Sequence, residues 1–277
     1  MTIDHGTTGD VTPHGRGYIL PFRLAGRRKR HAAAMGQFAP VAGVQPLKVY
    51  VGYDSREDIA WQVCRHSIER HMSSNVAIHS LRQPELRNLG LYTRPGDSTA
   101  STEFSLTRFL TPYIAGHDGW SLFVDCDFLF TRDITELLKG LDPRKAVYVV
   151  KHDYVPASAM KMDGKVQTTY PRKNWSSFML FNGAHSHVKK LTPDFVNQSS
   201  PQHLHRFEWL PDEDMIGALD VSWNFLVGEY PIPDEKPAAI HFTNGGPWFS
   251  ECGGVEFSDL WLEEQALYFK SHHALSR

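Results

Sequence analysis

Two aspartates separated by one residue, Asp125 and Asp127, are the strongest chemical signal in the sequence. They follow the short apolar run 120–124, whose length and preceding glycine favour a core strand. Side chains two residues apart in a strand point to the same side, so both carboxylates can face one point. Two such carboxylates repel each other and are costly to desolvate unless a cation neutralises them. Their oxygen ligands suit Mg²⁺ or Mn²⁺, which complete their shells with water and substrate phosphates.

A structural role is the alternative for this pair, because a helical pattern at 134–138 follows it and acidic residues cap helices. Asp133 stands directly before that pattern and is the better cap candidate. The two aspartates alone therefore leave metal binding and helix capping open, and the rest of the chain has to decide between them.

Strands and helices alternate along most of the chain. The hydrophobic pattern predicts helices at 57–72 and 105–115, with Pro112 interrupting the end of the second. The predicted strands are 47–54, 76–81, 120–124, 146–150, 177–181 and 238–242. This alternation indicates an α/β sandwich with a largely parallel sheet, in which ligands bind beyond the carboxyl ends of the strands.

Composition limits the classes of function and partner. The chain has 277 residues and a formal net charge of -2, which gives no global electrostatic reason to bind nucleic acid. Three cysteines argue against a disulfide framework, and no apolar stretch is long enough to cross a bilayer. We expect a cytoplasmic protein with no transmembrane segment. Residues 1–46 lack apolar periodicity and contain the basic run RRKRH, so we expect a disordered or loosely attached N-terminal tail.

Four segments together resemble glycosyltransferase family 8, whose members have the GT-A fold. SLFVDCDFLF resembles the D-x-D strand end of that family, and SLTRFL at 105–110 resembles its arginine-bearing helix. PDEDMI at 211–216 resembles the D-Q-D segment, and IHFTNGGPW at 240–248 resembles the histidine-glycine-proline-tryptophan motif. The four occur in the family's order. The resemblance spans about residues 47–250 and implies a single GT-A domain over 47–277, a Rossmann-like sandwich with a mixed, mostly parallel sheet.

The resemblance also assigns expected roles. His241 ends an apolar run and is the expected third metal ligand beside Asp125 and Asp127, a set that suits Mn²⁺ better than Mg²⁺. The acidic trio at 212–214 is expected near the anomeric carbon of the sugar, where positive charge develops. Expected contacts to the nucleotide sugar are Tyr53, Asp54, Arg108, Asp125, Gly245 and Gly246. The catalytic candidates are Asp212, Glu213 and Asp214.

Each of these residues also has a structural alternative. His241 is otherwise a hydrogen-bonded core histidine, and Arg108 forms a surface salt bridge on a helix. Tyr53 and Asp54 otherwise form only a turn. The acidic trio precedes a pattern of helical spacing at 215–219, and the dipole of that helix would stabilise it. The histidine pairs His185/His187 and His203/His205 are expected at the surface, because no ligand at zinc spacing accompanies them. The aromatic side chains that line either the core or an acceptor groove are Trp209, Trp223, Phe225 and Trp248.

The chain departs from the family pattern at three places. Gly246 stands where a diphosphate-binding lysine is usual, so the cation and Arg108, or Lys173, have to carry more of the phosphate charge. Glu213 stands where the family has glutamine. The segment 174–177 replaces the usual lining of the sugar pocket, so the donor sugar is left open.

We therefore expect a metal-dependent, retaining glycosyltransferase that moves a hexosyl unit from a UDP-sugar to an acceptor hydroxyl of unknown type. A sugar-nucleotide nucleotidyltransferase is the first alternative, but such enzymes carry a glycine-rich basic loop after the first strand. Here residues 52–57 contain one glycine and two acids. A catalytically inactive sugar-binding protein of the same fold is the second alternative.

Overall fold

The structure is a computed structural model that describes residues 47–74, 76–96, 101–153 and 172–274. These residues belong to one compact unit, Gly43–Arg277. The expected tail at 1–46 lies outside the described residues, so the domain boundary at residue 47 stays a prediction.

The larger of two sheets has six strands in the order β2-β1-β3-β6-β5-β7. β1 is parallel to β2 and β3, and β5 is parallel to β7, while β6 runs antiparallel to both of its neighbours. The sheet is therefore mixed and mostly parallel, as the sequence predicted. In chain order these strands are β1 Lys48–Gly52, β2 Ala77–Leu81, β3 Trp120–Val124, β5 Val147–Val150, β6 Phe178–Asn182 and β7 Ile216–Leu219.

A second sheet has three strands in the order β4-β9-β8. It combines one strand from the middle of the chain with two from near its end. Its strands are β4 Phe128–Phe130, β8 Phe225–Leu226 and β9 Ala239–His241. β4 and β9 are antiparallel, with Phe128 opposite His241. The strand predicted at 238–242 therefore exists, and it brings His241 next to the residue that follows Asp127.

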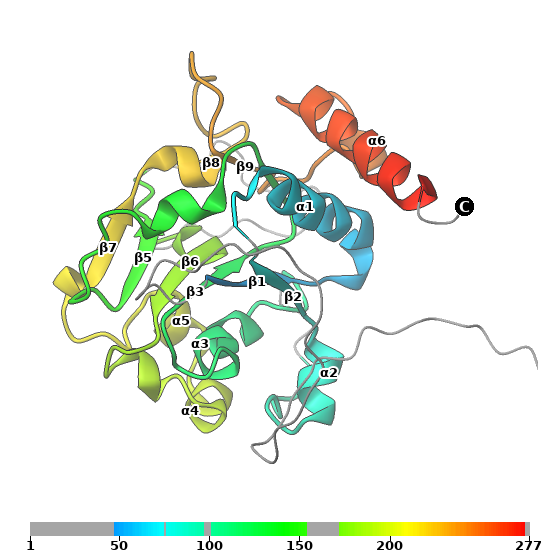
Figure 1. Cartoon of the computed structure of the whole chain (residues 1–277). Coiled ribbons are helices and arrows are strands. Elements are labelled where there is room, and N and C mark those ends of the chain that lie inside the picture. The colour runs from blue at the N-terminus through cyan, green and yellow to red at the C-terminus, as the bar shows by residue number, and fades with distance from the viewer. Residues whose placement is uncertain (1–46, 75, 97–100, 154–171, 275–277) are drawn as a thin grey trace, which may run out of the picture. The chain divides into compact units, whose positions relative to one another are not determined.

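Helices cover both faces of the large sheet (Figure 1). α1 Asp58–His71 and α6 Ser258–Ala274 lie on one face, and α3 Thr111–Ile114, α4 Pro193–Gln198 and α5 Pro201–His205 lie on the other. α2 Gln83–Asn88 follows the edge strand β2. This layering confirms the predicted α/β sandwich. Within the described part of the chain, no helix combines the length and the apolar character that a membrane crossing requires.

Short 3-10 helices occupy many of the connections. They are Ser55–Glu57, Thr107–Leu110, Ile134–Leu138, Trp175–Ser177, Val188–Lys190, Glu213–Met215, Val221–Asn224 and Ser250–Cys252. Asp133 caps one of them by accepting a hydrogen bond from the Thr135 backbone N–H at 2.9 Å. The cap role therefore belongs to Asp133 and not to the two aspartates before it.

Two predicted helical segments were wrong in detail. The segment 105–115 is a 3-10 helix followed by α3, and Pro112 lies in the first turn of α3, where its missing N–H is not needed. The apolar pattern at 215–219 has helical spacing, yet Ile216–Leu219 forms β7, because it pairs with β5 in the buried sheet. The acidic trio therefore precedes a strand, and the expected stabilisation by a helix dipole does not apply.

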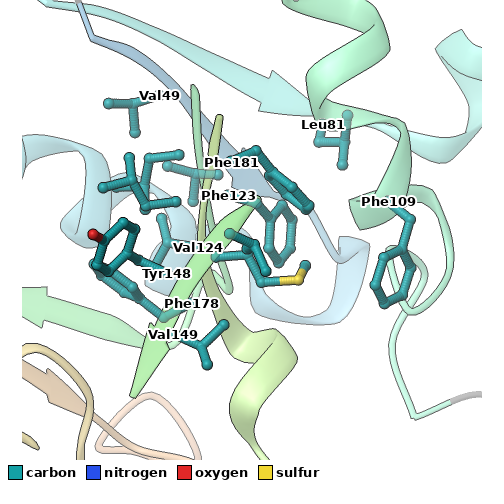
Figure 2. Close-up of a cluster of buried hydrophobic side chains, with 14 of the residues drawn as sticks. Val49, Leu81, Phe109, Phe123, Val124, Tyr148, Val149, Phe178 and Phe181 are labelled. Carbon is teal, nitrogen blue, oxygen red and sulfur yellow. The ribbon is translucent and has the colours of Figure 1, made fainter. Parts of the chain in front are cut away.

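The core of the large sheet is rich in aromatic and branched side chains (Figure 2). Phe123 and Phe178 are fully buried on the neighbouring strands β3 and β6, and Tyr148 of β5 lies near them. Burial of each such side chain stabilises the fold by roughly 1.5–3 kcal/mol. Cys64, Cys126 and Cys252 are also buried and are not linked to one another. The strand before Asp125, β3, therefore runs through the apolar core.

A buried glutamate joins α6 to α1. Glu264 of α6 is 4% exposed and accepts hydrogen bonds from Arg70 Nε at 3.0 Å. Its Oε1 also lies 2.6 Å from Nδ1 of His66. Because both partners belong to α1, Glu264 holds the last helix of the described chain in place.

Replacement of Glu264 by alanine is expected to lower the free energy of unfolding by about 1–3 kcal/mol, because His66 and Arg70 lose a buried acceptor. Urea unfolding followed by circular dichroism measures this change. Glu263→Ala is the matched control, since Glu263 is exposed on the same turn and its loss is expected to change stability by less than about 0.5 kcal/mol. Equal effects of the two substitutions would contradict the role of Glu264.

Candidate active site

Three side chains that could bind a cation meet between the two sheets. Asp125 follows β3, Asp127 precedes β4, and His241 is the last residue of β9. One ligand atom from each residue lies within 4.8 Å of those of the other two. The structure thus brings together the three residues that the sequence marked as metal ligands.

Backbone hydrogen bonds fix this arrangement. The N–H of Asp125 donates to the carbonyl of Ser177 at 3.0 Å, which ties the end of β3 to the start of β6. The N–H of Phe242 donates to the carbonyl of Asp127 at 2.9 Å, next to the β4–β9 pair. The separation of the two aspartates from His241 is therefore set by sheet pairing and not by flexible loops.

His241 is almost completely buried and is contacted on three sides. Its Nε2 lies 3.3 Å from Oδ2 of Asp127, and its Nδ1 lies 2.8 Å from Oδ1 of Asn224. The ring stacks on Phe128, with centroids 4.2 Å apart and an angle of 17° between the planes. These contacts direct Nε2 toward the aspartates.

Arg108 lies inside the protein and not on a surface helix. Its side chain is 6% exposed, and Nη1 lies 2.9 Å from both Asp125 Oδ1 and the carbonyl of Ser176. The guanidinium also lies over the rings of Phe104 and Phe123, at 5.2 and 5.0 Å. The prediction of a surface salt bridge is therefore wrong. Arg108 instead forms a buried ion pair with Asp125.

Glu57 is a third acidic group near Asp125 and Asp127, and the sequence did not single it out. It stands directly before α1, in the turn that follows β1. Burial and the charge of Asp127, followed by that of Asp54, raise the pKa of Glu57 to about 8. The position of Glu57 at the carboxyl end of β1, parallel to β3, is the sequence signal that could have found it.

The turn after β1 gives Asp54 and Tyr53 clear structural partners. Asp54 is fully buried and accepts hydrogen bonds from the backbone and side chain of Arg56 at 2.8–3.0 Å and from the Glu103 N–H at 3.1 Å. The Tyr53 hydroxyl donates to Asp58 at 2.8 Å, and the guanidinium of Arg82 lies 3.4 Å from its ring centre. Asp54 thus forms the turn, and Arg82 covers one face of Tyr53.

The acidic trio stands at the start of the edge strand β7. Asp212 caps its turn by accepting from the Asp214 N–H at 2.8 Å. Glu213 is also exposed, and its carboxylate lies 3.0 Å from Arg172 Nη2 and 3.4 Å from Lys151 Nζ. The hydrogen bond from Arg172, together with the charges of both cations, lowers the pKa of Glu213. Glu213 is therefore ionised near neutral pH.

Comparison of whole sequences gives a family for the chain. No family model matches it. Protein CDI of Arabidopsis thaliana is 48% identical over 232 residues, which cover 82% of this chain and 89% of that protein. The chain belongs to the family of Protein CDI.

Solved structures similar to this member of the Protein CDI family are glycosyltransferases. WbbM, a bifunctional glycosyltransferase, gives a TM-score of 0.57 at 19% identity, over 83% of this chain and 51% of that one. GlyE of Streptococcus pneumoniae TIGR4 gives 0.54 at 15% identity, over 84% of this chain and 65% of that one. The chain thus spans between half and two thirds of their lengths. The likeness shows the GT-A fold, while membership of family 8 stays a prediction.

The glycines of the last motif shape the chain after β9. Gly245 has φ 107°, a conformation that favours glycine. A Cβ on Gly246 would lie 2.1 Å from the ring of Trp248, which packs against Phe242 and Trp261. The indole therefore fills the space beside Gly246, and this explains why no lysine stands there. Lys173, the substitute considered from the sequence, is buried at 8% exposure.

Histidines 152 and 205 are part of the interior around the site. Nδ1 of His205 lies 2.8 Å from Ser176 Oγ, and its ring packs edge-on against Phe109. His205 is therefore half-buried with its ring packed inward, whereas the sequence placed it at the surface. His152, which the sequence did not mark, is buried with Nδ1 2.9 Å from the Tyr230 hydroxyl. Burial lowers the pKa of both histidines to about 3, helped at His205 by the charge of Arg108.

The remaining histidines and aromatic side chains are less informative. His185, His187 and His203 are each partly exposed, and the rings of the first two lie 5.6 Å apart. The aromatic side chains considered for an acceptor groove are largely core residues: Trp209 is 6%, Trp223 8% and Phe225 4% exposed.

Replacement of Gly246 by alanine is expected to destabilise the protein by about 1–3 kcal/mol, because the added methyl group overlaps the indole of Trp248. Thermal unfolding measures the loss. Gly254→Ala is the control, since no atom lies within 4 Å of the added Cβ there. A Gly246→Ala variant as stable as Gly254→Ala would show that Trp248 moves freely.

His205→Gln is expected to reduce the acid sensitivity of the fold. Because the folded pKa of His205 is depressed, its contribution to stability is complete above the unfolded value of about 6.5 and is lost as the pH falls toward 3. One such histidine changes the unfolding free energy by up to about 1.4 kcal/mol per pH unit in that window. Urea unfolding between pH 4 and 7 should show a slope smaller by about one proton in His205→Gln. An unchanged slope would contradict the depressed pKa, and His203→Gln is the control at the partly exposed neighbour.

Proposed function

We propose that this member of the Protein CDI family is a divalent-metal-dependent glycosyltransferase. It moves a hexosyl unit from a nucleotide-diphosphate sugar, with UDP as the expected nucleotide, to an acceptor hydroxyl and retains the anomeric configuration. The observation that carries the proposal is the convergence of Asp125, Asp127 and His241 within 4.8 Å in a GT-A fold.

The donor set fits a hard or borderline divalent cation. Two carboxylates provide oxygen ligands and one imidazole provides a nitrogen, a combination that favours Mn²⁺ over Mg²⁺. Arg108 neutralises only one of the carboxylates, and the raised pKa of nearby Glu57, about 8, reflects burial and the negative charge that remains. When bound, the cation supplies Lewis-acid stabilisation of the departing diphosphate.

Other side chains and glycines of the site are proposed to position Asp125 and to contact the nucleotide and its diphosphate. Arg108 holds Asp125 in place, since it is buried against both Asp125 and Ser176. Gly245 and Gly246 let the backbone after His241 approach the diphosphate, and Lys173 is the candidate replacement for the missing motif lysine. Tyr53 is the candidate to stack on the base, while Asp54 supports that position through the turn it forms.

The acidic trio is proposed to act on the sugar. Among Asp212, Glu213 and Asp214, Glu213 is the best candidate, because Arg172 and Lys151 keep its carboxylate ionised at a position accessible to a ligand. A carboxylate of this kind stabilises the positive charge that develops at the anomeric carbon.

Asp127→Asn is expected to lower UDP release from the preferred UDP-sugar by on the order of 100-fold, because the variant loses a charged metal ligand. The measurement is nucleoside diphosphate release from a panel of nucleotide sugars in the presence of Mn²⁺. Asp118→Asn is the control, since the side chain of Asp118 is 62% exposed. Wild-type activity in Asp127→Asn would contradict the proposal.

The same assay separates the two alternatives. Pyrophosphate exchange with a nucleoside triphosphate would favour the nucleotidyltransferase, although Asp54 and Glu57 make the turn after β1 acidic. Mn²⁺ binding without turnover of any donor would favour a catalytically inactive sugar-binding protein.

A further inference from the structure

Asn224 contacts the one nitrogen of His241 that does not face the aspartates. Nδ1 of His241 lies 2.8 Å from Oδ1 of Asn224, whereas Nε2 lies 3.3 Å from Oδ2 of Asp127. A histidine binds a metal through an unprotonated nitrogen, and the hydrogen bond at the other nitrogen decides which one that is. The tautomer of His241 therefore depends on whether the oxygen or the NH₂ group of the Asn224 amide faces Nδ1.

The orientation of the Asn224 amide follows from its other partners. Nδ2 donates to Ser177 Oγ at 2.9 Å and to the carbonyl of Asn174 at 3.4 Å. A backbone carbonyl only accepts, so the amide group that faces Asn174 must be the NH₂. The hydroxyl of Ser177 donates its own hydrogen to the same carbonyl at 2.7 Å and so accepts from Asn224. Oδ1 consequently faces His241, and Nδ1 of His241 must carry the hydrogen.

Burial and packing keep this arrangement in place. Asn224 is 0% exposed and His241 is 2% exposed, so water does not compete for their hydrogen bond. The stacking of His241 on Phe128 at 4.2 Å opposes rotation of the ring. A buried amide whose NH₂ and carbonyl oxygen each have a partner is suited to select one tautomer.

We propose that Asn224 is a positioning residue that holds His241 as the Nδ1–H tautomer, with the Nε2 lone pair directed toward Asp125 and Asp127. By keeping the nitrogen ligand available, Asn224 sets the preference of the site for Mn²⁺ over Mg²⁺. This inference rests on the proposed metal-dependent function for its purpose, but the tautomer itself is a property of the protein alone.

The first measurement is the tautomer of His241 in the full-length wild-type chain. ¹⁵N NMR of histidine-labelled protein distinguishes Nδ1–H from Nε2–H, and the His241→Gln variant assigns the resonance among the 15 histidines. We expect Nδ1 of His241 to carry a hydrogen without added metal, whether or not Nε2 also donates one to Asp127. A His241 that carries its hydrogen on Nε2 alone would overturn the inference, whatever the variants do.

The second measurement compares Asn224→Leu with Asn182→Leu. Asn182 is also a buried amide, but it donates to the carbonyls of Pro143 and Lys145 at the far end of β6. In Asn224→Leu we expect mixed tautomers and a Kd for MnCl₂, by calorimetry, weaker by about 10–100-fold. The Kd for MgCl₂ is expected to change far less, because Mg²⁺ depends on the carboxylates. Asn182→Leu should lose stability only.

The outcomes separate this inference from the proposed function. Equal Mn²⁺ affinity in Asn224→Leu and Asn182→Leu would overturn the role of Asn224 and leave the transferase proposal standing. Absence of sugar transfer in a wild-type protein that has the Nδ1–H tautomer and binds Mn²⁺ would contradict the transferase and support the positioning role. If Asn224→Leu does not fold, Asn224→Asp replaces it. This variant keeps an acceptor beside Nδ1 and is expected to keep the hydrogen on Nδ1. Loss of that hydrogen in Asn224→Asp would overturn the inference.

Discussion

The repulsion between two carboxylates at the end of β3 is the constraint on which the site depends. Asp125 and Asp127 leave an apolar strand together, and burial makes their like charges more costly. The protein opposes this cost with Arg108, which is itself buried against aromatic rings. Burial and the charges of the neighbouring aspartates raise the pKa of Glu57 to about 8, so negative charge remains in excess here and favours a bound cation.

The second sheet places the third candidate ligand, His241, beside the two aspartates. β9 comes from the end of the chain and pairs with β4, so His241 is placed by backbone hydrogen bonds opposite Phe128. The site therefore joins residues more than one hundred positions apart without relying on a mobile loop. Such rigid support keeps ligands within the narrow distances that a metal or a phosphate demands.

Periodicity and motif order predicted the sandwich, the mixed sheet and the residues that converge at its edge. They failed where tertiary contacts decide: Ile216–Leu219 has helical spacing but is a strand, because it pairs with β5. Glu57 and Asn224 were missed, since neither belongs to a motif and their roles arise only from partners brought near by folding. His205 was placed at the surface because its neighbours in sequence are polar, although its neighbours in space are Ser176 and Phe109.

The segment Trp175–Ser177 constrains how the sequence of this site can evolve. The carbonyl of Ser176 holds Arg108, which serves Asp125, and the hydroxyl of Ser177 holds Asn224, which serves His241. Two adjacent residues thus support opposite sides of one cluster. A substitution that shifts this backbone disturbs both sides at once, so tolerated variants should arise as coordinated sets, and a mutation harmless in one relative can be damaging in another.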